Sequence, residues 1–112
     1  MNTHSPPIQN LDSLDVVGER KDGGVDLLIS CSGPLDDSPA TLRLLAQKVA
    51  NYLTGAAHAN FSNVYPAAKR GPVRIFISCD YVVSEGARRE IASLAQRAAT
   101  MGVELKLGSP VA

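Results

Sequence analysis

Two stretches of the chain, VDLLISC (25–31) and VRIFISC (73–79), align with each other without a gap. Each has the length and composition of a β-strand that is buried in a sheet. Because side chains alternate between the two faces of a strand, the apolar phase that ends in Cys31 or Cys79 should face a core. The intervening phase carries Asp26 and Arg74 at equivalent positions. We predict that the two strands are adjacent and parallel, with Asp26 and Arg74 paired on the same outer face.

Two further strands are predicted, one from a turn signal and one from alternating side chains. The sequence Lys-Asp-Gly-Gly at 21–24 joins residues 14–20 to the first repeated stretch. An Asp-Gly pair between apolar segments predicts an antiparallel hairpin, because glycine readily adopts positive φ. Residues 103–107 alternate between apolar and polar side chains, which predicts the last strand.

Two helices are predicted between the strands. Ser38 can cap the first, with proline at its first position, and its 3.6-residue pattern ends at Gly55. Ser84 opens the second helix and Gly102 closes it. The polar side of the first helix includes Lys48. The side chains predicted to be buried are Leu42, Leu45, Ala46, Val49, Tyr52 and Leu53 in the first helix and Ala87, Ile91, Leu94, Ala95, Ala98 and Met101 in the second.

The element order is therefore ββαβαβ. Strands that are separated by a helix are joined by right-handed crossovers into parallel pairs, whereas the hairpin is antiparallel. One phase of the strands is apolar throughout and the other is mostly polar, which indicates one buried and one solvated sheet face. We predict an α/β two-layer sandwich, with a four-stranded mixed sheet and both helices on one face.

Length and composition limit the possible functions. A chain of 112 residues forms one domain, which we place at 13–108, between a flexible tail at 1–12 and a short C-terminal tail at 109–112. The 11 basic and 11 acidic residues give a net charge of zero, so nucleic acid and anionic membranes are not attracted. The N-terminus lacks a secretory signal pattern, and no apolar run is long enough to cross a bilayer. We expect a cytoplasmic protein that binds neither nucleic acid nor membrane.

The carboxyl edge of the sheet is one candidate site. Cys31 and Cys79 end their strands there and are followed by Asp36, Asp37 and Asp80. Ligands usually bind at this edge of an open α/β sheet, so one interpretation of these residues is the site of a small enzyme or of a ligand-binding protein. The other is that both cysteines are small buried hydrophobic residues. Since the sequence has no metal-binding or nucleotide-binding motif, we assign no catalytic residue, no metal ligand and no cofactor.

A surface for another protein is the second candidate. The connection at 56–71 is long for a compact domain, which is typical of a binding loop or a mobile loop, and it holds Phe61 and Tyr65. An apolar stripe on the outer face of the sheet would suit a protein partner or a weak homodimer if it is exposed, unless the loop or the tail covers it. Its predicted members are Val17, Leu28 and Phe76.

Short motifs across residues 14–110 resemble those of the anti-sigma-factor-antagonist (STAS) domain. Gly-Pro-Leu-Asp at 33–36 follows the second strand, and Gly-Val-Glu-Leu at 102–105 joins the last helix to the last strand. The family's Asp-Ser-Ser-Gly motif, at the start of the helix after the third strand, reads Val-Ser-Glu-Gly at 83–86. The resemblance implies a partner-binding domain in which Glu85 replaces the phosphorylated serine with a fixed negative charge.

These patterns favour a non-enzymatic protein-binding or regulatory domain. The alternative is a small enzyme or ligand-binding protein with a site at the carboxyl ends of the second and third strands, built from Cys31, Cys79 and Asp80. The candidate binding residues are Ser84, Glu85, Gly86, Asp36, Phe61, Tyr65, Leu28 and Phe76.

Overall fold

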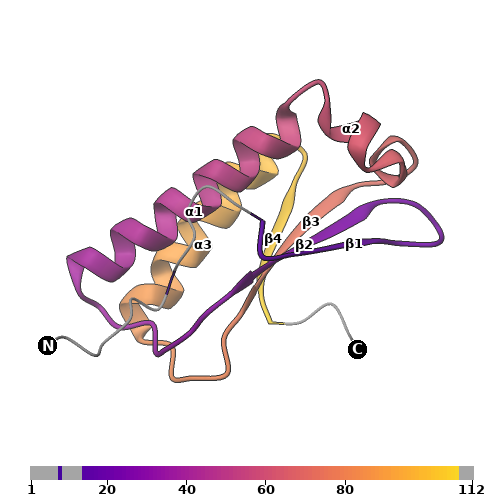
Figure 1. Ribbon diagram of the computed structural model, residues 1–112. Helices are drawn as coiled ribbons and strands as arrows, with labels where there is room; N and C mark the ends of the chain where they lie inside the picture. Colours follow the sequence, from indigo (N-terminus) through magenta and orange to yellow (C-terminus); the bar gives the residue numbers. More distant parts are fainter. Residues whose placement is uncertain (1–7, 9–13, 109–112) are drawn as a thin grey trace, which may run out of the picture.

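The computed structural model describes Ile8 and residues 14–108, which form a sheet with the long helices packed on one face (Figure 1). The elements in chain order are β1 (Val16–Glu19), β2 (Val25–Ser30), α1 (Pro39–Ala57), α2 (Phe61–Val64), the 3-10 helix η1 (Pro66–Lys69), β3 (Val73–Ser78), α3 (Glu85–Ala99) and β4 (Glu104–Leu107). The predicted α/β two-layer sandwich with a four-stranded mixed sheet is confirmed. Apart from Ile8, the tails predicted at 1–12 and 109–112 lie outside the described residues.

The two repeated stretches are neighbours in the sheet. The strand order is β1-β2-β3-β4, in which β1 and β2 are antiparallel and the other two pairs are parallel. Val25 is opposite Val73 and Ser30 is opposite Ser78, with every residue between them paired in the same register. The backbone amide of Cys31 donates to the carbonyl of Ser78 at 3.0 Å, which extends the ladder by one residue. The predicted adjacency and parallel direction are therefore confirmed.

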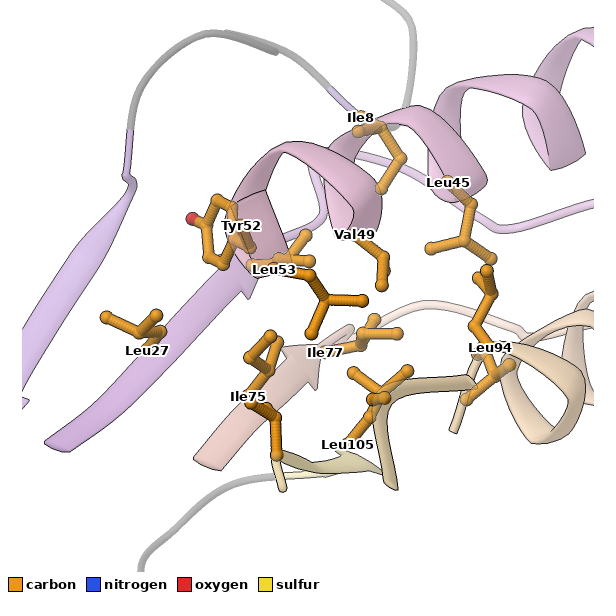
Figure 2. Packing of buried hydrophobic residues seen from close by; sticks show 14 of the residues in the cluster. Ile8, Leu27, Leu45, Val49, Tyr52, Leu53, Ile75, Ile77, Leu94 and Leu105 are labelled. Carbon is orange, nitrogen blue, oxygen red and sulfur yellow. The ribbon is translucent and has the colours of Figure 1, made fainter. Parts of the chain in front are cut away.

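The hydrophobic core lies between the sheet and the two long helices. Figure 2 shows side chains of α1, such as Val49 and Leu53, pointing toward Ile75 and Ile77 of β3. Ile8 also belongs to this core and lies close to α1 (Figure 2). Because α1 and α3 supply one layer and the sheet supplies the other, the apolar phase of both repeated stretches is removed from water.

Both helices end differently from the prediction. The first helix continues through Gly55 to Ala57, since one glycine costs a helix interior only about 1 kcal/mol. The second helix ends at Ala99, so Met101, which we predicted on its buried side, lies beyond it and is exposed. Gly102 has a φ of +75° and turns the chain toward β4, as glycine after a helix end commonly does.

The connection between α1 and β3 contains two short helices that were not predicted. Phe61 of α2 packs against Tyr65, with 5.1 Å between the ring centroids. The tip of the β1–β2 hairpin docks on η1, because Gly24 donates its amide to the carbonyl of Ala67 at 2.7 Å and Glu19 accepts the amide of Ala67 at 2.9 Å. These contacts order a segment that lacks any sequence periodicity.

On the outer face of the sheet, charged side chains cover the central residues Asp26 and Phe76. Arg74 binds Asp26 through two hydrogen bonds, from Nε to Oδ1 at 2.8 Å and from Nη2 to Oδ2 at 2.9 Å. Arg20 pairs with the same carboxylate. The guanidinium carbon of Arg74 lies 5.1 Å from the ring centroid of Phe76, which is only 5% exposed. The predicted pairing of Asp26 and Arg74 is confirmed, and Arg20 adds a second cation.

Val17 lies on the opposite face from the one predicted. It pairs with Leu27 and packs against the core, whereas Val16 pairs with Leu28 and points outward. The tight turn at 20–24 sets this register: the amide of Arg20 donates to the carbonyl of Gly24 at 2.9 Å, and the carbonyl of Arg20 accepts the amide of Gly23 at 3.1 Å. A shift of one residue reverses every side chain of a strand, and the outer stripe therefore contains Val16 in place of Val17.

Candidate functional site

Two loops extend the sheet at its carboxyl edge. The loop after β2 and the loop after β3 run parallel and meet in an isolated bridge between Leu35 and Val83. The amide of Leu35 donates to the carbonyl of Val82 at 3.0 Å, and the amide of Ser84 donates to the carbonyl of Leu35 at 2.8 Å. This bridge fixes the segments that lead into α1 and α3, so side chains from both loops lie at one edge.

The start of α3 lies at this edge. Ser84 caps the helix through its hydroxyl, which accepts a backbone amide of the first turn at 3.0 Å. Asp37, from the other loop, accepts the amide of Gly86 through Oδ1 at 3.0 Å. A Cβ at position 86 would lie 2.5 Å from that oxygen, so glycine permits the contact. Glu85 is exposed and forms an ion pair with Arg89 at 3.7 Å.

Asp36 is exposed in the same pair of loops and binds back to the chain. Its Oδ1 accepts the amide of Ser38 at 3.0 Å, and hydrogen bonds from Ser38 hold the pKa of Asp36 below its ordinary value. The structure therefore brings four of the predicted binding residues, Asp36 and the Ser-Glu-Gly sequence at 84–86, to one edge of the sheet.

Two exposed apolar residues at this edge were not identified from the sequence. Tyr81 is 50% exposed and Val82 is 77% exposed, in the loop between β3 and α3. The sequence contains a signal for them. Tyr81 and Val82 lie shortly before the helix cap Ser84, in a loop, and loops run over the protein surface. The carboxylates of the two loops and of the first turn of α3 are Asp36, Asp37, Asp80 and Glu85, all exposed.

Both predicted cysteines are half-buried free thiols at the ends of their strands. Burial, together with the neighbouring Cys79, raises the pKa of Cys31 to about 12. The sulfur of Cys79 lies 3.7 Å from the carbonyl oxygen of Gly33 and 3.6 Å from that of Tyr81. Because both thiols pack against the core, the arrangement favours structural cysteines over a nucleophile.

A buried polar cluster ties β1 to α1 beneath the same edge. Lys48, which we predicted on the polar side of the first helix, is fully buried and binds Asp15 through Nζ and Oδ1 at 2.9 Å. Asp15 also accepts the amide of Ser30 at 2.9 Å. Tyr52 donates its hydroxyl to the carbonyl of Leu28 at 2.8 Å, and burial raises the pKa of Tyr52 to about 12. These contacts anchor the start of the hairpin to the helical layer.

The other predicted binding residues lie elsewhere. Phe61 is buried and Tyr65 half-buried in the α1–β3 connection, at the opposite end of the sheet. Leu28 and Phe76 lie on the outer face, where Phe76 is covered by Arg74. The structure therefore divides the predicted binding residues among three separate places.

The described residues form neither a metal-ligand cluster nor a membrane-spanning helix. Within Ile8 and residues 14–108, no three His, Cys, Asp or Glu side chains converge as a metal site requires. In the same part of the chain, no helix has the length and apolar character needed to span a bilayer.

Comparison with known proteins identifies a family. Residues 7–110 match a family of unknown function, DUF6572. The chain belongs to this family. No curated protein matches this DUF6572 chain.

Two solved structures resemble the DUF6572 chain. A crystal structure of Mglu in its native form matches with 22% identity and a TM-score of 0.45, over 98% of this chain and 26% of the Mglu chain. A crystal structure of native Mglu in the presence of 4.3 M NaCl matches with 20% identity and a TM-score of 0.40, over 89% and 27%. The chain thus spans about a quarter of the length of Mglu.

Proposed function

We propose that this DUF6572 chain is a protein-binding domain with no chemistry of its own and that it docks through the carboxyl edge of its sheet. The observation that supports this proposal is the exposed pair Tyr81 and Val82. Large apolar side chains on a surface are typical of interfaces, where aromatic residues supply much of the binding energy. The Leu35–Val83 bridge holds the loop, so less conformational entropy is lost on binding.

The charge at this edge indicates the chemistry of the partner. The apolar pair stands among the exposed carboxylates of Asp36, Asp37, Asp80 and Glu85. A partner that places basic residues around an apolar recess would be complementary in both respects. Because these charges are exposed, their attraction would weaken as ionic strength rises.

The resemblance to the STAS domain supports the same edge. The Ser-Glu-Gly sequence at 84–86 lies at the start of α3, where that family carries its phosphorylated serine. Glu85 would supply a permanent negative charge there, so docking would not depend on phosphorylation. We place this activity in the cytoplasm, with a protein as the partner and neither nucleic acid nor membrane.

The test is affinity capture followed by a direct measurement of binding. Three baits at submicromolar concentration are exposed to an extract of the native host: wild type, Val82→Lys and Val64→Lys. Val64 is a matched control because it is 57% exposed but lies in α2, at the far end of the sheet. The captured protein is then purified, and its affinity for each chain is measured by calorimetry at low and high salt.

The proposal predicts that wild type and Val64→Lys bind equally and that Val82→Lys binds about tenfold more weakly or worse. High salt should weaken the wild-type complex. Equal binding by all three chains, or the absence of any partner that binds directly, would contradict a docking role for this edge.

A further inference from the structure

An apolar trough lies at the end of the molecule opposite the carboxyl edge. It runs between the C-terminal halves of α1 and α3, has a volume of about 170 Å³, and is lined by Leu53, Leu94, Arg97 and Met101 among others. A second hollow of about 240 Å³ continues it toward the start of β3 and shares Leu53 and Met101. Both long helices start near the carboxyl edge and run away from it (Figure 1), so the trough and the docking edge are at opposite ends.

Basic side chains lie at this trough and beside the hollow that continues it. Arg97 lines it, and the exposed Lys69 and Arg70 directly precede residues that line the second hollow. Residues 38–79, which include α1, α2 and η1, contain no Asp or Glu. The docking edge carries the opposite sign, through the exposed carboxylates named above. Arg97 and the neighbouring Lys69 and Arg70 are therefore complementary in charge to the carboxylates of the docking edge.

The two ends are also complementary in shape. The edge presents two projecting apolar side chains, Tyr81 and Val82, whereas the other end offers a hollow floored by Leu53 and Leu94. Met101 stands at this hollow and is 48% exposed, although a large apolar side chain gains free energy when it is covered. A surface with a basic rim around an apolar recess is the kind of partner that the edge requires.

We propose that the docking edge also binds a second copy of this chain, whose trough receives Tyr81 and Val82 beside Met101. This inference rests on the proposed function, since it names a second, weaker partner of the same surface. The contact joins two different surfaces, so copies associate head to tail and the resulting dimer keeps one free edge and one free trough.

The size of these surfaces sets the strength of the association. A stable protein interface buries about 1,200 Å² or more in total, and two side chains in shallow hollows bury less than that. The association should therefore be weak and reversible, appear only at high protein concentration, and decrease with added salt.

The test is sedimentation velocity of the full chain and of two variants with one broken surface each. Val82→Lys removes the apolar anchor and places a positive charge among the carboxylates of the edge. Met101→Asp places a carboxylate in the trough, where it repels the acidic edge of the next copy. Val16→Lys is the control, because Val16 is also exposed but lies on β1. Circular dichroism confirms that each variant is folded, which is expected because all three positions are exposed.

A head-to-tail contact makes a specific prediction for mixtures. Wild type and Val16→Lys should sediment faster as concentration rises toward millimolar, and each of the other variants should stay monomeric alone. A mixture of Val82→Lys and Met101→Asp should form a one-to-one dimer and nothing larger, because one intact edge meets one intact trough.

Two results would overturn the inference: a wild-type chain that stays monomeric at millimolar concentration, or a mixture that does not associate. Neither result decides the proposed function, which is measured with a host protein at bait concentrations too low for self-association.

Discussion

The two faces of the sheet exclude water by different means. The inner face is covered by α1 and α3, and its buried residues, such as Ile29 and Ile77, belong to the hydrophobic core. On the outer face, Asp26 and Phe76 are buried because Arg20 and Arg74 lie over them. The aliphatic stems of arginine cover apolar surface while the guanidinium groups stay hydrated. A sheet face without a helical layer can therefore be closed by its own charged side chains.

The largest effect is expected on the inner face. Ile77→Ala should reduce the free energy of unfolding by about 3 kcal/mol, because it removes buried methylene groups and leaves a cavity under the helices. Chemical denaturation at neutral pH measures this loss. A reduction below about 1 kcal/mol would mean that the inner face is packed more loosely than its complete burial indicates.

The outer face should respond to loss of its central carboxylate. Asp26→Ala should reduce the free energy of unfolding by about 2 kcal/mol, since it leaves the partly buried Arg20 and Arg74 without their shared partner. Glu104→Ala is the matched control, because Glu104 lies on the same face in an exposed pair with Lys106 and should cost less than about 0.5 kcal/mol. Similar losses for the two variants would show that the outer face is not closed by the cluster.

The same cluster should give the outer face a pH dependence. Burial alone would raise the pKa of Asp26, but hydrogen bonds and charges from Arg74 and Arg20 lower it overall, below its ordinary value of 3.8. A lowered folded-state pKa stabilises the fold above that value, and this stability is lost as pH falls through the folded pKa. The difference in unfolding free energy between wild type and Asp26→Asn should therefore shrink below about pH 4. A difference that stays constant down to pH 2 would contradict the assignment.

The smallest effect concerns the point where the inner face reaches the carboxyl edge. With its pKa raised to about 12, Cys31 should react slowly with iodoacetamide at neutral pH and more quickly once the chain is unfolded. The stability that the protonated thiol contributes is complete below about pH 9 and is lost as pH rises toward 12. Peptide-resolved mass spectrometry measures the reaction. Rapid alkylation of the native protein at pH 7 would favour the alternative of a small enzyme.

Most of the fold could be predicted because its signals are local. The repeat at 25–31 and 73–79 predicts strand phase and pairing, and Ser38 and Ser84 mark both helix starts. The face of Val17 could not be predicted, because it depends on which residues of the hairpin turn are paired. The burial of Lys48 could not be predicted for a similar reason, since it depends on Asp15, a partner 33 residues away.

The candidate site was predicted only in part. The carboxyl edge and the residues at 84–86 follow from the element order and the STAS-like motif. Tyr81 and Val82 were missed because exposure of a loop residue depends on tertiary contacts, here the bridge between Leu35 and Val83. The separation of Phe61 from this edge follows from the element order, because the α1–β3 connection lies where β3 starts and the edge lies where β3 ends.

The pair of Asp26 and Arg74 has a further consequence before the chain has folded. In the separate segments VDLLIS and VRIFIS, each of these residues is the only charge in a run of residues with high β-propensity. Such runs are prone to form intermolecular sheets, and a single charge inside them acts as a gatekeeper against aggregation. Because the two gatekeepers have opposite sign and identical register, they neutralise each other once β2 and β3 are paired. The charges that keep the nascent strands apart from other chains become the pair that holds the two strands together.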